Sequence, residues 1–463
     1  MLFHPNFREE PYWWDAAPPE DTRPEPIPNA ADVVIVGAGI CGVSAAIELA
    51  RGAAKVIVVD AGGLGSGASS RSGGMVTASP KAMLYASTLG QPGTADETML
   101  DQTKATLAFF KEIVRRECLD ADLQIRGRFY GAFSPRHRAR LQLQAAMLSE
   151  RTRMTVRLIE PENQHTEVGS AYFHGGFVVE EYGSVHPAKL HQALVRRARA
   201  LGASLHSHAR VFNIARRRSG YELATERGPI RADRVLFATN GYTDKAVPWA
   251  RHRVLPVASY QIATEPLPPG LMDELIPKRR MVSDSRKDLI YLRPTPDHSC
   301  LIFGCRPRAF DRRPTTMAPH LHARLARVFP QLRDSRITHA WSGFVGMTRD
   351  ALPHIAEHDG VLYALGCNGS GIALMTWLGW QAARVLRSGE HAPAIADQPF
   401  RRIPSWPTAS WLAALATLGY HLQDFACRPM EIVAERLGSA PPPRLRPQPI
   451  TLGPPSDVRP DIS

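Results

Sequence analysis

The chain has 463 residues, and 44% of them are apolar, so it is long enough to bury a large core and to form two domains. The formal net charge is +12, but the arginine clusters are short and lack interleaved aromatic residues, so nucleic acid is not the expected partner. The cysteines form no Cys-x-x-Cys pair, so we expect no metal site. The N-terminus has no signal-peptide pattern, so we expect a cytoplasmic protein. In that compartment the cysteines should be reduced, buried thiols; they are Cys41, Cys118, Cys300, Cys305, Cys367 and Cys427.

Residues 1–30 are rich in proline and acidic side chains and carry Tyr12, Trp13 and Trp14. This composition predicts an N-terminal arm that docks its aromatic side chains on the body of the protein. It does not predict a separate domain.

A nucleotide-binding pattern follows the arm. Val33 to Val36 is a β-branched run typical of a buried parallel strand. Residues 37–42 then read G-x-G-x-x-G and lead into a helix of small residues, and a second strand from Lys55 to Val59 ends at Asp60. Because strand, turn, helix, strand and acid lie in register, the segment predicts a dinucleotide site.

Each part of this pattern has a physical role. Gly37 allows the tight turn, Gly39 lets the backbone approach a pyrophosphate, and Gly42 lets the helix pack closely on the strand. The helix N-terminus offers N–H groups to the phosphates, and Asp60 can accept hydrogen bonds from the ribose.

A loop rich in glycine and serine, residues 62–74, leaves the second strand at its carboxyl end. Ligands of open α/β sheets bind at that edge, so we expect the loop to wrap a polar or anionic ligand. The alternative is a flexible surface loop. Helices predicted at 98–117 and 136–151, with strands at 124–133 and 176–180, then leave the βαβ pattern and begin a second domain.

The nucleotide domain resumes twice. Pro187 begins a helix that Gly202 ends, and strands are predicted at 204–214 and 233–239. After a second strand-rich stretch, residues 361–365 and 372–386 predict a last strand and helix. Residues 360–383 lack charge, but the polar turn at 368–371 favours strand, turn and helix over a membrane span.

We therefore predict the α/β class: a discontinuous Rossmann-like nucleotide-binding domain with a twice-inserted, strand-rich α+β substrate domain. The expected boundaries are an arm at 1–30, nucleotide-binding segments at 31–97, 183–250 and 340–395, substrate segments at 98–182 and 251–339, a C-terminal extension at 396–440, and a disordered tail at 441–463. Ser410 to Leu422 is apolar but short and could at most lie at a membrane surface.

Several motifs occur in one order along the chain, at residues 11–15, 37–42, 67–74, 186–190, 238–242, 256–266, 341–346 and 369–371. Together they resemble the glycine oxidase and D-amino-acid oxidase (DAO) family of FAD enzymes, in its γ-glutamylputrescine oxidase-like branch, over most of residues 10–400. The resemblance implies FAD and oxidation of a C–N bond, with hydride passing to flavin N5.

The resemblance also implies which residues contact the FAD. They are Gly37, Ala38, Gly39, Ile40, Gly42, Asp60, Ser69, Ser70, Arg71, Ser72, Gly73, Gly74, Val211, Asn240, Gly241, Gly369, Ser370, Gly371 and Ile372. Val211 would meet the adenine, and the turn at 369–372 would lie at the pyrimidine end of the flavin ring.

Three positions depart from the family pattern. Val345 stands where glycine oxidase-like enzymes have a carboxylate-binding arginine, which favours an amine or N-substituted amine over a small α-amino acid. Gly343 stands where sarcosine oxidase-like members hold the flavin on a cysteine, so the FAD should be non-covalent. Ala373 replaces their oxygen-activating lysine, so the electron acceptor is either O₂ activated in another way or another acceptor such as a quinone or carrier protein.

Tyr291 and Arg293 alternate on one predicted strand and could both face the substrate, although an exposed strand explains them equally. Tyr260 could join an aromatic wall around an amine, or it could be a core residue. The expected function is an FAD-dependent amine or amino-acid oxidase or dehydrogenase. The alternatives are an FAD-dependent tRNA-modification enzyme and a non-catalytic flavin-binding subunit; the oligomeric state is left open.

Overall fold

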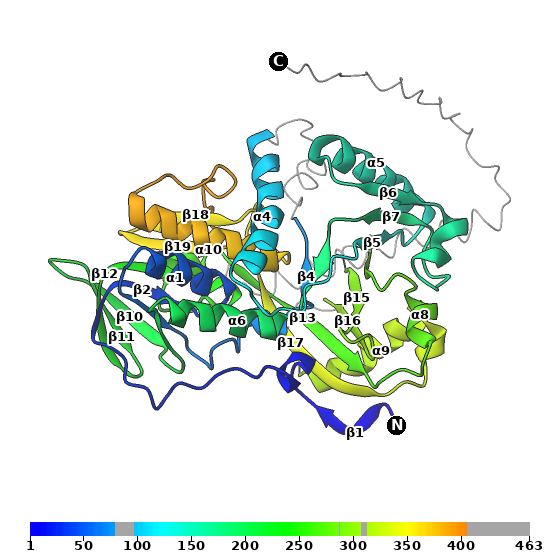
Figure 1. Cartoon of the computed structure of the whole chain (residues 1–463), viewed down its shortest axis with the longest axis horizontal. Coiled ribbons are helices and arrows are strands. Elements are labelled where there is room, and N and C mark those ends of the chain that lie inside the picture. Colours follow the sequence, from blue (N-terminus) through cyan, green and yellow to red (C-terminus); the bar gives the residue numbers. More distant parts are fainter. Residues whose placement is uncertain (79–96, 287, 307–312, 405–463) are drawn as a thin grey trace, which may run out of the picture.

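The computed structural model describes residues 1–78, 97–286, 288–306 and 313–404. Two large sheets organise these residues, one with eight strands and one with nine. In Figure 1 the smaller sheet and its helices form one side of the molecule, and the larger sheet forms the other. The predicted C-terminal tail, the segment Ser410 to Leu422 and Cys427 lie outside the described residues.

The parallel core of the eight-stranded sheet is built around the strand that precedes the first glycine turn. β2 (Ala30–Val36) lies between β3 (Val56–Val59) and β12 (Gly228–Phe237), and the two outer neighbours are β9 (Ser204–His206) and β19 (Val361–Leu365). This pairing confirms the predicted βαβ arrangement.

Both faces of β2 are buried, as expected for a parallel strand. Val33 and Ile35 pack on the side of helices α1 (Ile40–Arg51), α6 (Pro187–Ala200) and α10 (Gly371–Ser388), whereas Val34 and Val36 pack on the opposite side. Figure 1 shows these helices beside the sheet.

The predicted strand at 204–214 is wrong in one respect, because it is divided into two strands. β9 ends at His206 and β10 (Val211–Arg216) begins five residues later. His208 adopts φ +49° and donates its N–H to Gly62 O at 2.9 Å, while Ala209 donates to Asp60 O at 2.7 Å. The chain therefore turns around the end of β3, and β10 continues into an antiparallel pair with β11 (Tyr221–Thr225).

The nine-stranded sheet is mostly antiparallel, and one of its faces is covered by α9 (Pro314–Val328). In sheet order its strands are β1 (Phe3–Arg8), β17 (Ile337–Met347), β13 (Leu255–Thr264), β16 (Leu301–Cys305), β15 (Ile290–Pro294), β14 (Met281–Asp284), β5 (Arg128–Gly131), β7 (Gly176–Val179) and β6 (Val156–Ile159). The other helices and short strands are α2 (Ala68–Arg71), α4 (Glu97–Arg116), α5 (Pro135–Thr152), α7 (Pro248–Arg251), α8 (Leu271–Leu275), β4 (Met75–Val76), β8 (Gly183–Ser184) and β18 (His354–His358).

The N-terminal arm contacts both parts of the molecule. Its first residues form β1, which pairs with β17, so the arm also extends the larger sheet. Trp13 is fully buried and donates its indole N–H to Ser72 O at 2.9 Å, and Trp14 donates to Ser70 Oγ at 2.7 Å. The predicted docking of the arm aromatics is confirmed for these two side chains.

Cys118 is exposed, so the expectation of a buried thiol is wrong at this position. It follows the C-terminal end of α4 and adopts φ +49°. The predicted boundary at residue 340 falls inside β17, whose pairing with β13 places that strand in the larger sheet. The domain boundaries otherwise stay a prediction. In the described part of the chain, no helix is long and apolar enough to cross a membrane.

Candidate functional site

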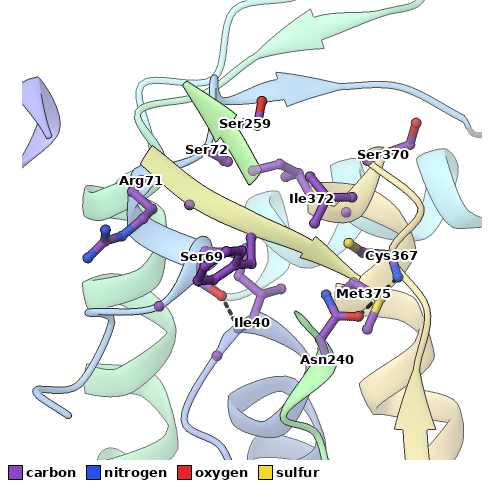
Figure 2. Close-up of a pocket in the computed structure, with 18 of the residues that line it drawn as sticks. Ile40, Ser69, Arg71, Ser72, Asn240, Ser259, Cys367, Ser370, Ile372 and Met375 are labelled. Atoms are coloured by element: carbon purple, nitrogen blue, oxygen red, sulfur yellow. Dashed lines mark hydrogen bonds between the residues drawn. The ribbon is translucent and has the colours of Figure 1, made fainter. Parts of the chain in front are cut away.

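A cavity of about 620 Å³ lies between the two sheets, within the size range of small-molecule sites. Three turns line it: the first turn (residues 37–42), the serine loop (residues 67–74) and the last turn (residues 366–371). Segments that are hundreds of residues apart in the sequence thus meet at one site, as Figure 2 shows for residues of all three turns.

The first turn has almost no space for side chains. Gly37 adopts φ +104°, a conformation that favours glycine, and donates its N–H to Val59 O at 2.8 Å. A Cβ atom on Gly42 would lie 2.0 Å from Gly37 O, so glycine is required where α1 leaves the strand. A Cβ atom on Gly39 would lie 2.9 Å from Ser69 Oγ. Bare backbone therefore faces the cavity at the N-terminus of α1.

Asp60 fixes the conformation of the neighbouring loops. Its Oδ2 accepts the N–H of Ala38 at 2.8 Å, and its Oδ1 accepts the N–H of Gly62 at 3.0 Å. Burial raises the pKa of this carboxyl above its usual value, although the backbone N–H groups act in the opposite direction. Asp60 and Val211, the predicted ribose and adenine contacts, both line the cavity.

The serine loop is tied to the first turn and to the larger sheet. Ser69 Oγ accepts the N–H of Ile40 at 2.9 Å, a bond drawn in Figure 2. Arg71 donates to Ser342 O at 2.9 Å and lies 4.8 Å from the ring of Trp14. Burial lowers the pKa of its guanidinium. Because Arg71 is engaged by carbonyls and by the arm, it braces the loop.

The last turn is held by two asparagines. Asn240 adopts φ +45°, and its Oδ1 accepts the N–H groups of Gly366 at 3.1 Å and Cys367 at 3.3 Å; Figure 2 shows Asn240 next to Cys367. Fully buried Asn368 donates to Gly366 O at 3.0 Å. These bonds set the start of α10, whose first-turn N–H groups have no acceptor within the helix.

One face of the nine-stranded sheet forms the floor of the cavity. Register explains which residues face it: Tyr291 lies opposite Ser283 and Gly304, and Gly304 lies opposite Gln261. Residues two positions along each strand share this face. The floor residues are Arg128, Tyr130, Phe177, Ser259, Gln261, Ser283, Tyr291, Gly343 and Val345.

Gln261 presents an unsatisfied acceptor to the cavity. Its Nε2 donates to Arg71 O at 2.8 Å, which fixes the orientation of the amide because a carbonyl can only accept. Its Oε1 is buried and has no hydrogen-bond partner among the described residues. A buried acceptor without a partner is costly, so this oxygen indicates a ligand that carries a donor.

Tyr291 is the predicted substrate residue that the structure places in the cavity. Its hydroxyl lies 2.9 Å from Ser259 Oγ, and burial raises its pKa to about 12, so the phenol is protonated at neutral pH. A Cβ atom on Gly73 would lie 3.1 Å from the Tyr291 ring, so the ring borders the serine loop.

The other two predicted substrate residues do not line the cavity. Tyr260 and Ile290 both pair with Cys305, so their side chains share one face of the sheet. Tyr291 follows Ile290 and faces the other way, so Tyr260 packs in the core on the side opposite the cavity floor. Arg293 shares the face of Tyr291, but it is 2% exposed and donates to Val185 O at 2.7 Å beneath the arm. Because neither Tyr260 nor Arg293 lines the cavity, the expectation that they face the substrate needs correction.

Most of the predicted cofactor-contacting residues line the cavity. They are Gly37, Ala38, Gly39, Ile40, Asp60, Ser69, Arg71, Ser72, Gly73, Gly74, Val211, Asn240, Gly369, Ser370, Gly371 and Ile372. Three of the predicted residues do not line the cavity: Gly42, Ser70 and Gly241. Gly42 and Gly241 pack closely against neighbouring backbone, and Ser70 accepts the indole N–H of Trp14.

Four further residues of the floor were not among the predicted site residues: Ser259, Gln261, Ser283 and Tyr130. The available signal was two polar residues, Ser259 and Gln261, that alternate within an otherwise apolar strand.

Comparison with protein families gives a match over residues 32–385 to the family described as DAO, FAD dependent oxidoreductase. Among curated proteins, the chain is 29% identical to "Probable oxidoreductase OrdL" of Rhizobium meliloti, over 89% of this chain and 97% of that protein. It is 27% identical to the gamma-glutamylputrescine oxidoreductase of Escherichia coli, over 88% of this chain and 95% of that protein.

Comparison with solved structures supports the same fold. The glycine oxidase of Geobacillus kaustophilus aligns with a TM-score of 0.68 at 24% identity, covering 81% of this chain and 99% of that one. The L-proline dehydrogenase of P. horikoshii aligns with a TM-score of 0.65 at 19% identity, covering 80% of this chain and 96% of that one.

Proposed function

Because the chain belongs to the DAO family of FAD-dependent oxidoreductases, we propose that it oxidises a C–N bond of an amine or an N-substituted amino acid. When bound, FAD supplies the oxidising chemistry by accepting a hydride at N5. The product is an imine, which water hydrolyses to a carbonyl compound and an amine.

The residues around the cavity fit this cofactor. In our proposal, the bare backbone of the first turn and the N-terminus of α1 bind the pyrophosphate. Asp60 accepts hydrogen bonds from the ribose, and the backbone of Val211 contacts the adenine. The serine loop and the last turn hold the flavin ring, where the first-turn N–H groups of α10 can stabilise negative charge on the reduced ring.

The observation that carries the proposal is the convergence of the three turns on the polar floor of one cavity. Tyr291 and Gln261 lie next to Gly73 of the serine loop, so a substrate on the floor would be adjacent to the cofactor. Val345 lines the cavity, and its apolar side chain cannot bind a substrate carboxylate. This favours an amine or N-substituted amine over a small α-amino acid.

The test is anaerobic mixing of the purified yellow protein with amines, N-methyl amino acids and small α-amino acids while the flavin absorbance is followed. We expect bleaching by at least one amine or N-substituted compound, and weaker bleaching by glycine. Flavin that no C–N compound reduces, although dithionite reduces it, would contradict an enzymatic role and leave a flavin-binding subunit as the better explanation.

Attachment of the flavin can be tested separately. Because Gly343 has no thiol, we propose that acid precipitation releases the FAD into the supernatant. Flavin that stays with the precipitated protein would show a covalent link and contradict this part of the proposal.

The tRNA-modification alternative is favoured by the net charge of +12. It predicts RNA that co-purifies with the protein and dissociates with increasing salt. Reduction of the flavin by free amines without RNA would favour the amine oxidoreductase.

A further inference from the structure

The cavity contains a guanidinium that no carboxylate of the described residues neutralises. Arg306 directly follows β16 and lines the cavity. No ion pair or hydrogen bond to it is found among the described residues, and its Nε is buried without a partner. Arg306 is half-buried, and a partly desolvated cation without a partner is stabilised when a ligand of opposite charge pairs with it.

Strand register places Arg306 relative to the cofactor side of the cavity. Gly304 lies opposite both Tyr291 and Gln261, and a residue two positions along the same strand shares that face. Arg306 is the first residue after β16, so it follows Gly304 on this side of the chain, and it lines the same cavity. Arg293 pairs with Ile302 and lies at the end of the floor that the arm covers. Arg306 lies on the other side of Gly304, away from that end.

The other arginines of the cavity are already engaged. Arg71 donates to Ser342 O at 2.9 Å, and Arg210 pairs with Asp244 at 2.8 Å. Arg128 donates to Ser283 Oγ at 3.1 Å and lies 4.6 Å from the ring of Tyr130. Arg306 alone among these four has neither partner nor stacking ring in the described part of the chain.

The acidic residue on this side of the cavity is engaged as well. Asp284 pairs with Arg286 and accepts the N–H of Ile290 at 2.9 Å. It is therefore not the counter-charge of Arg306. A ligand carboxylate would match the planar donors of the guanidinium in a bidentate pair.

We propose that Arg306 binds a carboxylate of the substrate, so that the enzyme acts on an amine that carries an acidic group some distance from the oxidised carbon. This inference rests on the proposed function and refines it. Val345 makes the position of the family's carboxylate-binding arginine apolar. Arg306 supplies a cation elsewhere in the cavity, two residues after Gly304, the residue that pairs with Tyr291. The unsatisfied Gln261 Oε1 faces the same cavity and offers an acceptor for a substrate N–H.

The test compares matched ligands on the FAD-containing, full-length protein. Straight-chain amines of three to six carbons are paired with ω-amino acids of the same length, and the concentration dependence of anaerobic flavin reduction gives the apparent Kd. We expect the best ω-amino acid to bind at least about tenfold more tightly than its matched amine, because a charge-assisted pair is added.

Variants assign this preference to Arg306. Arg306→Gln should weaken binding of the ω-amino acid about 10- to 100-fold and leave the matched amine unchanged. Arg306→Lys should restore part of the preference. Arg231→Gln removes an equal charge from an exposed position, with 79% of the side chain accessible, and should change neither ligand. Equal affinities for both ligands in the parent protein, or an equal loss for both in Arg306→Gln, would overturn the inference.

A binding measurement separates this inference from the proposed function. Hexanoate should perturb the flavin absorbance spectrum of the parent protein, and the perturbation should weaken in Arg306→Gln and persist in Arg231→Gln. If no amine reduces the flavin, the proposed function fails, but this titration still decides the site. An unchanged hexanoate response in Arg306→Gln rejects the site even if amines are oxidised.

Discussion

Asp60 directly follows β3 and connects the first turn to the loop after the strand. Both of its carboxylate oxygens accept backbone N–H groups, from Ala38 and Gly62. The residue therefore orders the loops around the proposed ribose site in addition to offering an acceptor there.

We predict that Asp60→Asn weakens FAD binding by at least about tenfold, because an amide nitrogen cannot accept a backbone N–H and hydrogen bonds to charged groups contribute about 1.5–3 kcal/mol. The measurement is fluorescence titration of the apoprotein with FAD. Asp32→Asn is the control, since Asp32 also accepts a backbone N–H, from Lys55 at 2.8 Å, but does not line the cavity. Equal affinity in the two variants would contradict the assignment.

Asp284 should make stability depend on pH. Burial raises its pKa from 3.8 to about 6 despite the pair with Arg286. A carboxyl with a higher pKa in the folded state binds more protons when folded, so its contribution to the free energy of unfolding falls as the pH rises from about 4 to 6.

We therefore predict that the parent protein loses stability relative to Asp284→Asn over this pH range, by at most about 1.4 kcal/mol per pH unit, and that the difference is constant at higher pH. Urea unfolding between pH 4.5 and 7.5 measures it. Asp273→Asn, which removes the carboxylate of an exposed ion pair, serves as the comparison variant. A difference that does not change with pH would refute the prediction.

At the scale of elements, strand parity decides which side chains reach the cavity. Ser259 and Gln261 of β13 face the floor, while Tyr260 and Ile262 between and beyond them pack in the core under α9. The alternation of Ser259 and Gln261 with apolar residues shows that this strand has two different faces, but the sequence does not indicate whether the polar face meets a ligand or solvent.

Helices α1 and α10 approach each other at a glycine. A Cβ atom on Gly379 would lie 2.0 Å from Cys41 O, in backbone that cannot rotate away. We predict that Gly379→Ala lowers the melting temperature and weakens FAD binding, because overpacking of about 1–3 kcal/mol or more exceeds the gain of about 1 kcal/mol from the helix propensity of alanine.

Thermal unfolding and FAD titration measure both effects. Gln381→Ala lies two residues further along the same helix and should leave both quantities close to those of the parent. A Gly379→Ala protein as stable as the parent would mean that the helices can separate without cost.

At the scale of the whole molecule, the arm joins the two sheets. Trp13 packs with Ala188 of α6 and with Trp341, Ala263 and Ile302 of the larger sheet, and it donates to Ser72 O in the serine loop. One side chain thus contacts both halves of the fold and the segment proposed to hold the flavin.

We predict that Trp13→Ala costs about 3–5 kcal/mol of stability and accelerates release of FAD, since it leaves a cavity behind the serine loop. Trp13→Phe should lie between, because it keeps most of the apolar contact and loses one hydrogen bond of about 1 kcal/mol. Urea unfolding and the rate of FAD dissociation measure these effects. Leu143→Ala, at a side chain that is largely exposed, is the control, and a Trp13→Ala variant as mild as this control would disprove the role of the arm.

The sequence alone determined the parallel core, the first turn, the cofactor and the family. These features depend on local patterns: an apolar run, glycines at fixed spacing and an acid at the end of the next strand. Several separate motifs in one order gave the family, and the match over residues 32–385 confirms it.

Only the tertiary structure decided which of the predicted substrate residues line the cavity. The position of Arg306, the orientation of Gln261 and the burial of Tyr260 and Arg293 all follow from strand register and from the arm that covers one end of the floor. Register is set by pairing between strands that are far apart in the sequence, and a shift of one residue would turn every side chain to the other face. Local patterns carry no information about such a shift, so the residues on the floor of the cavity could be identified only from the fold.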